Sequence, residues 1–292
     1  MWTELLKVQG PYNFELVLDR LLLDPLHAVD RKSRTVRVPL YYNGEPFIVS
    51  VQGTGTIDSP EFLISGSFYE SKEYAIERVK QIFHLHLPLQ DIQSHFEGTD
   101  LKDIFREHRG TAIVLDFDYF GCLVKCIIHQ QLNLAFAHTL TERFVKNFGF
   151  DLDGVWFYPS PSTTASLNVE QLRELQFSNR KAEYVIGLAK EIIGGRLDLD
   201  QLIQKSDHEI IDELVKIRGI GRWTAENFLL FGLGRPNLFP MADIGIQNAL
   251  KKLYGLQHKP TIDEMETYSR SWSPFLSYAS LYLWRSIEKR SE

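Results

Sequence analysis

The chain has 292 residues, of which 44% are hydrophobic and 24% are charged, and its formal net charge is −6. This composition excludes a disordered or low-complexity chain and is typical of a globular protein with two or three subdomains. No run of about 18 consecutive apolar residues exists, which excludes a membrane-spanning helix, and the acidic balance argues mildly against a nucleic-acid partner.

The first hundred residues carry strand signals. Two β-rich runs are joined by Asn43-Gly44, a dipeptide that favours a tight hairpin turn. A third run and two helical segments accompany them, so we expect an α+β subdomain over residues 1–98, with helices packed on an antiparallel β-sheet. The strand runs are residues 35–42, 46–52 and 61–66, and the helical segments are 14–23 and 72–83.

The start of the chain and its cysteines indicate the compartment. Residues 1–7 lack the charged and apolar regions of a signal peptide, so we expect a cytoplasmic protein. Cys122 and Cys126 lie four positions apart in an apolar helical pattern, and we expect both to be reduced core residues. Two cysteines cannot alone ligate an iron–sulfur cluster or a structural zinc, so neither is expected.

Residues 99–292 follow a helical pattern, and we expect an all-helical region there. The apolar side chains between Phe117 and Ile128 have the spacing of a buried amphipathic helix. Ser206-Asp-His-Glu209 is a capping box, which marks the start of another helix. The expected helices are residues 117–130 and 134–148, one opened by Ser178, one entering at Ser206 and one at 274–288, with a loop at 159–163.

The segment Arg218-Gly219-Ile220-Gly221 predicts a hairpin between two helices. Neither glycine has a Cβ, so the chain can reverse tightly and a foreign backbone can approach it. The free N–H groups at the start of the second helix then form an anion site suited to a phosphate. Gly-x-Gly alone is weak evidence, but here Trp223-Thr-Ala225 follows, and Asp243 lies 22 positions after Gly221.

This combination resembles the helix–hairpin–helix DNA glycosylase superfamily, and within it the AlkA-type 3-methyladenine DNA glycosylases. The resemblance extends from about residue 9 to the C-terminus and implies two helical subdomains with a cleft between them. The segments that carry it, besides the hairpin, are Pro11-Tyr-Asn-Phe14, residues 122–131, and Trp272-Ser-Pro-Phe-Leu-Ser-Tyr-Ala279 with Trp284-Arg285.

The resemblance implies that Asp243 is catalytic. By position alone, Asp243 would be a helix N-cap, the commonest role for an aspartate at the start of a helix. In the family this carboxylate faces the sugar of an extruded nucleotide, where it can stabilise an oxocarbenium-like transition state. Capping and catalysis are compatible in one residue.

Trp223 and Gln131 are the next two positions of interest. Family members that also cut the DNA strand carry a lysine at the position of Trp223, so the resemblance implies that this chain lacks the lyase nucleophile. The alternative is a core tryptophan. Gln131 falls where the family inserts a wedge into the duplex to fill the space of the flipped base. By composition alone, it would be part of a polar helix end.

The resemblance also implies the remaining site residues. Trp223, Trp272 and Tyr119 are expected in the substrate pocket. Gln131, Gly219, Gly221, Arg218, Arg222 and Thr224 are expected to bind DNA. The backbone carbonyls of Val215, Ile217 and Ile220 are expected to hold a structural Na⁺ or K⁺, which would attract a phosphate.

We therefore expect a monomeric, monofunctional DNA glycosylase that removes alkylated purines from double-stranded DNA, without a catalytic cofactor. The alternatives are a glycosylase for oxidised or deaminated purines, and a non-catalytic module that binds DNA damage. Arg20 and Asn227 stand where the family pocket can be aromatic, so the accepted bases are open. Two further departures are Arg218, in place of a proline, and Leu276, in place of an arginine.

Overall fold

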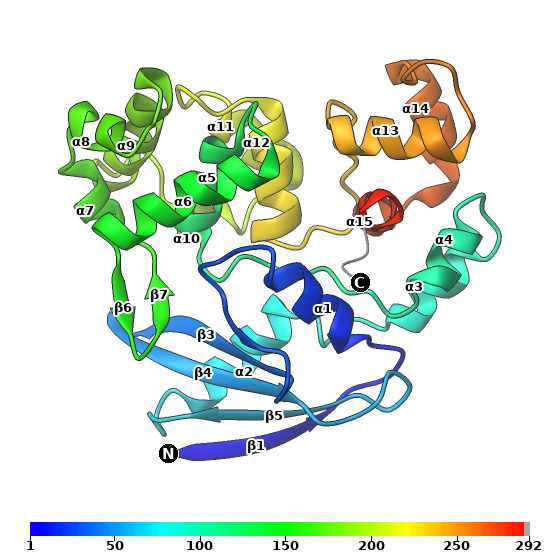
Figure 1. Cartoon of the computed structure of the whole chain (residues 1–292), viewed down its shortest axis with the longest axis horizontal. Coiled ribbons are helices and arrows are strands. Elements are labelled where there is room, and N and C mark those ends of the chain that lie inside the picture. Colours follow the sequence, from blue (N-terminus) through cyan, green and yellow to red (C-terminus); the bar gives the residue numbers. More distant parts are fainter. Residues whose placement is uncertain (289–292) are drawn as a thin grey trace.

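A five-stranded antiparallel sheet forms the base of the molecule, whose computed structural model describes residues 1–288 (Figure 1). The strand order is β1-β5-β4-β3-β2. The β3–β4 hairpin turns through Asn43 and Gly44 at φ 51° and 83°, both in the left-handed region that such a turn uses. Alternate side chains of β3 and β4 are buried, so one face of the sheet is apolar and packs against α1 and α2. The bounds are β1 Trp2–Lys7, α1 Phe14–Leu21, β2 Ala28–Asp30, β3 Thr35–Tyr42, β4 Glu45–Gly53, β5 Glu61–Gly66 and α2 Lys72–Ile82.

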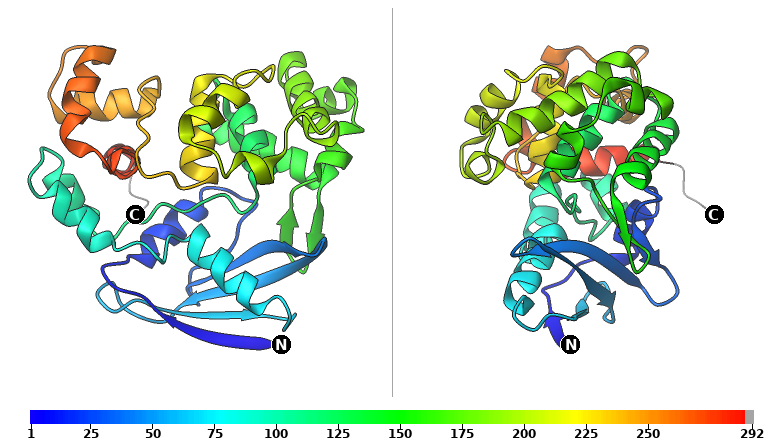
Figure 2. Two further views of the ribbon diagram at one scale, coloured as in Figure 1. Left: turned by 180° about the vertical axis from the view of Figure 1, so that it is seen from behind. Right: turned by 90° about the vertical axis from the view of Figure 1, so that its left-hand side faces the viewer.

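The helices above the sheet form two lobes, seen side by side in Figures 1 and 2. The first lobe contains α5 Tyr119–His129, α6 Leu134–Phe148, α7 Pro161–Ala165, α8 Val169–Glu174, α9 Asn179–Ile193, α10 Leu199–Leu202, α11 Asp207–Leu214 and α12 Arg222–Asn227, with the π-helical turn Phe228–Gly232 and the hairpin of β6 Phe150–Leu152 and β7 Val155–Phe157. The second contains α3 Leu89–Phe96, α4 Lys102–Glu107, α13 Ile244–Leu253, α14 Ile262–Ser269, the 3₁₀ turn Arg270–Trp272 and α15 Leu276–Ile287.

Two clusters of buried side chains hold these parts together. The first joins the sheet and α1–α4 to α13–α15, and in it the rings of Phe105 and Tyr282 stack at 3.7 Å between centroids. The second fills the lobe of α5–α12. The last helices therefore share a core with the N-terminal sheet, and neither cluster follows the predicted boundary at residue 98, which stays a prediction.

Most predicted elements are confirmed, including the three strands, the helices of residues 119–129 and 134–148, and the capping box of Ser206 and Glu209. The prediction of a loop over 159–163 is wrong in part, because α7 begins at Pro161. Ser160 caps α7 and Pro161 occupies its first turn, a combination that favours a helix start. Cys122 and Cys126 are buried and free, as predicted. No helix among residues 1–288 combines the length and the apolar character needed to cross a bilayer.

Candidate functional site

The hairpin between α11 and α12 owes its shape to Gly219 and not to Gly221. Gly219 has φ 98°, and a Cβ there would lie 2.2 Å from Cγ of Tyr184. A side chain at this position would strain the backbone and clash. Gly221 has φ −94°, and a Cβ there would meet nothing within 4 Å. The fold leaves room for a side chain at 221, so its glycine fits a need for close approach from outside.

Gln130 joins the end of α5 to this hairpin. Its Nε2 donates to the carbonyl of Gly219 and to Oγ1 of Thr224, both at 2.8 Å. Lys181, on α9, donates to three carbonyls at the end of α5 at 2.7 to 3.0 Å, and so caps that helix. The loop after α5 and the hairpin are thereby held as one surface.

Gln131 lies on this surface in the loop between α5 and α6. It is exposed and has φ 57°, the left-handed conformation that costs a non-glycine residue on the order of 1 kcal/mol. It lines the same cleft as Trp223 and Asp243. This position is compatible with the predicted wedge.

Asp243 is the N-cap of α13 and also the acceptor for two indoles. Its Oδ1 accepts the amide of Ile246 at 3.0 Å and Nε1 of Trp284 at 2.9 Å. Its Oδ2 accepts Nε1 of Trp223 at a longer 3.4 Å. The carboxylate is thus oriented by N–H donors and forms no ion pair among the described residues, which leaves its charge available to a cationic guest.

Two cavities meet at Asp243 and Trp223, which line both of them. The outer one is a cleft of about 1050 Å³ between the hairpin, the loop of Gln131 and the start of α13. The inner pocket has about 490 Å³ and is bounded by parts of α1, α5, α6 and α15. A group that enters from the cleft reaches the carboxylate at the mouth of the inner pocket.

The inner pocket has an acidic lining. Burial lowers the pKa of His129 to about 3 and also lowers the pKa of His27 and His138, so these rings are neutral at pH 7. Among the described lining residues, two cations then face four carboxylates, which gives a formal charge of −2. The cations are Arg20 and Lys125, and the carboxylates are Asp24, Asp116, Asp243 and Glu288.

Asp24 contributes a buried negative charge to this lining. It is 6% exposed, and burial alone would raise its pKa, but His27, Lys125 and the amide of Leu26 lower it overall. Its Oδ2 lies 3.9 Å from Nδ1 of His138, and that nitrogen is buried without a hydrogen-bond partner within residues 1–288. The Asp24 carboxylate, a hydrogen-bond acceptor, therefore lies next to a ring nitrogen of His138 that makes no hydrogen bond within residues 1–288.

Arg20 and Asn227, noted as departures from an aromatic pocket, both line the inner pocket. The Arg20 guanidinium lies 5.7 Å from the centre of the Phe231 ring, and Asn227 donates to the carbonyl of Trp223 at 2.7 Å. The lining of the inner pocket is accordingly mixed and contains both aromatic rings and polar groups.

Trp272 and Tyr119, both predicted for the substrate pocket, line neither the cleft nor the inner pocket, whereas Thr224 lines the cleft but is buried. Trp272 is 0% exposed in the first core, where its Nε1 donates to Asp100 at 2.8 Å. Tyr119 lines a different cavity, and its hydroxyl accepts from Arg78 at 3.3 Å. Thr224 is 1% exposed and its hydroxyl accepts from Gln130, so it positions that side chain and is not a surface contact.

Arg218 and Arg222 flank the hairpin, each with a carboxylate partner. Arg218 pairs with Glu183 and Arg222 with Glu226, both at 2.8 Å, and each arginine side chain is 75% exposed. The Arg218–Glu183 pair is exposed and contributes little to stability, whereas Glu226 is buried, at 9% exposure. The guanidinium of Arg218 can therefore exchange its partner for an incoming phosphate more readily than that of Arg222 can.

Trp284 and Gln130 are the functional candidates that sequence reasoning did not assign. The sequence feature that could have pointed to Trp284 is Gly245. A Cβ at position 245 would lie 2.9 Å from the Trp284 ring, so the close packing of this ring requires a glycine there. The carbonyl site for a cation at Val215, Ile217 and Ile220 stays a prediction. The carbonyl of Ile217 accepts the amide of Ile220 at 3.0 Å and keeps a second lone pair. Within residues 1–288 no group of three or more His, Cys, Asp or Glu could hold a metal ion.

Comparison with known proteins places this geometry in context. The profile of the HhH-GPD superfamily base excision DNA repair proteins matches residues 124–274. A Bacillus subtilis protein, YfjP, provisionally named a DNA-3-methyladenine glycosylase, is 54% identical over 289 residues, which cover 99% of this chain and 100% of YfjP. The DNA-3-methyladenine glycosylase of the same organism is 35% identical over 191 residues, 64% of this chain and 63% of that relative.

Solved structures share the architecture. The 3-methyladenine DNA glycosylase of Archaeoglobus fulgidus matches with a TM-score of 0.85 over 98% of both chains at 24% identity, which shows the fold. The Schizosaccharomyces pombe 3-methyladenine DNA glycosylase Mag1, in complex with abasic DNA, matches with a TM-score of 0.61 at 26% identity, over 68% of this chain and 98% of its own.

Proposed function

Because the chain belongs to the HhH-GPD superfamily of base excision DNA repair proteins, we propose that it is a monofunctional DNA glycosylase. It hydrolyses the N-glycosidic bond of alkylated purines, such as 3-methyladenine and 7-methylguanine, that are flipped out of duplex DNA. The observation that carries this proposal is the carboxylate of Asp243, which two indoles and a backbone amide orient at the mouth of a pocket.

The acidic inner pocket supports a cationic base as the substrate. Alkylation at N3 or N7 gives the purine nucleoside a positive charge, and the pocket lining carries a formal excess of two negative charges. The charged base is also a good leaving group, so cleavage needs no general acid. Asp243 then stabilises the positive charge that develops on the sugar, while Trp223 can stack on the electron-poor ring.

The residues that line the cleft support a reaction that hydrolyses the N-glycosidic bond without cleaving the DNA strand. Lys181 is the one lysine that lines it within the described residues. Burial lowers the pKa of Lys181 to about 8, but its ammonium group donates to three carbonyls at the end of α5. The amine cannot attack a sugar without giving up that helix cap, so a Schiff base is not expected.

The hairpin is the proposed anchor for DNA. Gly221 leaves the start of α12 open to a phosphate, Arg218 and Arg222 flank it, and a monovalent cation on the carbonyls of Val215, Ile217 and Ile220 would add charge. Gln131 is the proposed wedge. The protein acts as a monomer in the cytoplasm.

Base release from methylated DNA by wild type and Asp243→Asn tests the proposal. Asparagine can still cap α13 but carries no charge, so we expect the variant to fold and bind lesion DNA while base release falls by a factor on the order of 10². Alkali should reveal abasic sites after wild-type reaction, and borohydride should trap no covalent adduct. Turnover near wild type in the variant would refute the role of Asp243, and a trapped adduct would refute the monofunctional mechanism.

A further inference from the structure

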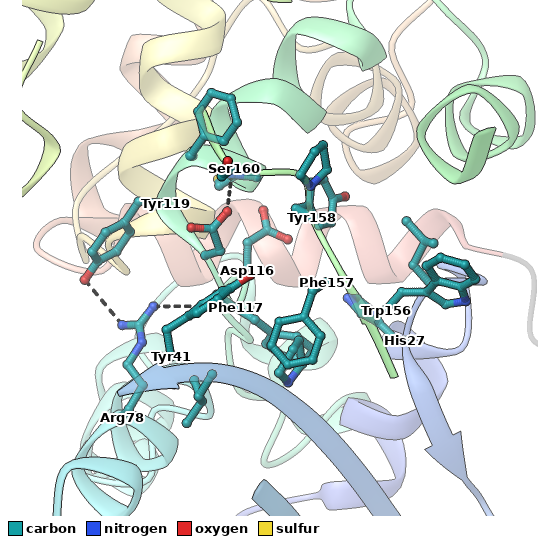
Figure 3. A pocket seen from close by; sticks show the side chains of 18 of the residues that line it. His27, Tyr41, Arg78, Asp116, Phe117, Tyr119, Trp156, Phe157, Tyr158 and Ser160 are labelled. Carbon is teal, nitrogen blue, oxygen red and sulfur yellow. Dashed lines mark hydrogen bonds between the residues drawn. The ribbon is translucent and has the colours of Figure 1, made fainter. Parts of the chain in front are cut away.

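A third cavity, of about 590 Å³, lies at the opposite end of α5 from the cleft and shares no lining residue with it (Figure 3). The cavity begins where α5 begins and is closed by the sheet, by α2 and by β7 with the loop after it. Its volume is in the range of sites for small organic ligands. Nothing in the proposed glycosylase reaction uses it.

Aromatic rings make up much of its wall. Figure 3 shows Tyr41, Phe117, Tyr119, Trp156 and Tyr158 around one space, and they come from three separate segments of the chain. Tyr41 meets Phe157 edge to face at 5.4 Å, which fixes the orientation of that side of the wall. Such walls suit a flat ring that can stack.

Arg78 is the polar group on the α2 side. It is 9% exposed, and its three hydrogen bonds, to Gln81, the Tyr119 hydroxyl and the Phe117 carbonyl, are all 3.3 Å long. No carboxylate lies within 4 Å of its guanidinium among residues 1–288, although a buried arginine usually has one. The planar fork of N–H donors therefore retains capacity for an acceptor in the cavity.

Asp118 is the polar group on the α5 side. One oxygen accepts the amide of Gly121 and so caps α5, while the side chain as a whole is exposed. Its carboxylate can still accept hydrogen bonds from a ligand. The lining thus offers donors on one wall and an acceptor on another.

The charges of this cavity balance. Asp116 is paired with Lys125, which leaves Arg37 and Arg78 against Asp118 and Asp200. The inner pocket beside Asp243 has an acidic excess, whereas this cavity has none, so it fits a neutral ring better than a cation.

We propose that this cavity binds a neutral guanine-type purine, free or as a nucleoside, stacked between the aromatic walls. Arg78 donates to O6 and N7, the two acceptors that an arginine fork matches, and Asp118 accepts N1–H and the N2 amino group. Adenine offers neither the paired acceptors nor the N1–H donor. The site lies apart from the cleft of Asp243, although His27 and Asp116 line both this cavity and the inner pocket.

Titration of the full-length protein with guanosine tests the proposal. The readout is the indole N–H resonance of Trp156 in an NMR spectrum, assigned with Trp156→Phe. Guanosine should shift it saturably, and inosine, which lacks the N2 amino group, should bind several-fold more weakly. 7-Methylguanosine should bind at least tenfold more weakly, because methylation blocks N7 and adds a charge. Absence of a saturable shift at millimolar guanosine, or equal binding of all three nucleosides, would overturn the proposal.

Two variants locate the contact. Arg78→Lys keeps the charge but loses the fork, and Asp118→Asn keeps the helix cap, so both preserve a group that the fold uses. Each should weaken guanosine binding by about tenfold, and Asp118→Asn should reduce the preference for guanosine over inosine. Asp243→Asn should leave guanosine binding unchanged. Loss of binding in Asp243→Asn, or shifts at Trp223 in place of Trp156, would assign the nucleoside to the catalytic cleft and refute a second site, whatever the glycosylase assay shows.

Discussion

At the scale of single residues, the two hairpin glycines have different reasons to be glycine. Gly219→Ala would place a methyl group against Tyr184 in a backbone with φ 98°, so we expect a loss of about 2 kcal/mol or more in the free energy of unfolding. Gly221→Ala should change that free energy by less than about 1 kcal/mol, because its Cβ meets nothing.

The two variants, Gly219→Ala and Gly221→Ala, distinguish an effect on folding from an effect on DNA binding. Urea unfolding and affinity for abasic-analogue DNA should be measured side by side. Gly221→Ala should fold like wild type and bind DNA about tenfold more weakly, because its methyl group stands where a phosphate approaches. Unchanged DNA affinity in Gly221→Ala would show that the hairpin is only a structural turn.

The sequence predicted the position of a residue best where that type of residue suits only one kind of structural environment. The residues around Asp243 predicted that it lies at the start of a helix, and Asp243 caps α13. Trp272 could not be placed, because a tryptophan suits a core and a stacking pocket equally, and only the position of Asp100 decides between them. Trp284 lies 41 positions from Asp243, so their contact depends on how α13 and α15 pack, which no local pattern encodes.

At the scale of elements, the loop between α5 and α6 carries the next prediction. Gln131→Ala should leave stability unchanged and weaken binding to lesion duplexes by about five- to tenfold, since the wedge offsets part of the few kcal/mol of unstacking. Gln131→Gly removes the side chain and also relieves the left-handed backbone, so an equal loss in both variants assigns the effect to the side chain. Single-stranded substrate is the control and should be bound equally by all three proteins. If Gln131→Ala binds the lesion duplex as tightly as wild type does, Leu132 is the next candidate for the wedge.

Elements with strong local signals were predicted and those that depend on their neighbours were not. The β3–β4 hairpin follows from Asn43-Gly44, and α9 and α11 follow from their serine caps. β1 was not predicted, because its strand is defined by pairing with β5 across about sixty residues. The core that α13–α15 share with the sheet was missed for the same reason.

At the scale of the whole molecule, the net charge of −6 determines how strongly the affinity for DNA depends on salt. Backbone amides and a few arginines contribute little to counterion release, so the plot of log affinity against log salt should be shallow, with a slope of roughly −2 to −3. Fluorescence anisotropy with abasic-analogue DNA at several salt concentrations measures it. A slope near that of a strongly basic binder, which neutralises six to ten phosphates, would reveal a basic face that the charge balance hides.

Stability should fall as the solution becomes mildly acidic. Burial lowers the pKa of His84 and of His129 to about 3, against about 6.5 in an unfolded chain. The unfolded state therefore binds more protons below pH 6.5, and the stabilisation present above that pH is lost as pH falls toward 3, at up to about 1.4 kcal/mol per pH unit for each ring. Urea midpoints between pH 7.5 and 5 should show this slope, and His84→Asn should reduce it by up to half. A midpoint independent of pH would contradict the prediction.

The shared core of the sheet with α13–α15 has a consequence for synthesis. The chain leaves the ribosome from its N-terminus, so the sheet is made first, while the helices that complete its core are made last. Apart from Leu26, the α5–α12 lobe has its core within residues made in between, and it can close earlier. The sheet with α1 and α2 lacks part of its core until α15 emerges, and Asp243 comes opposite Trp223 only when that last docking step is complete.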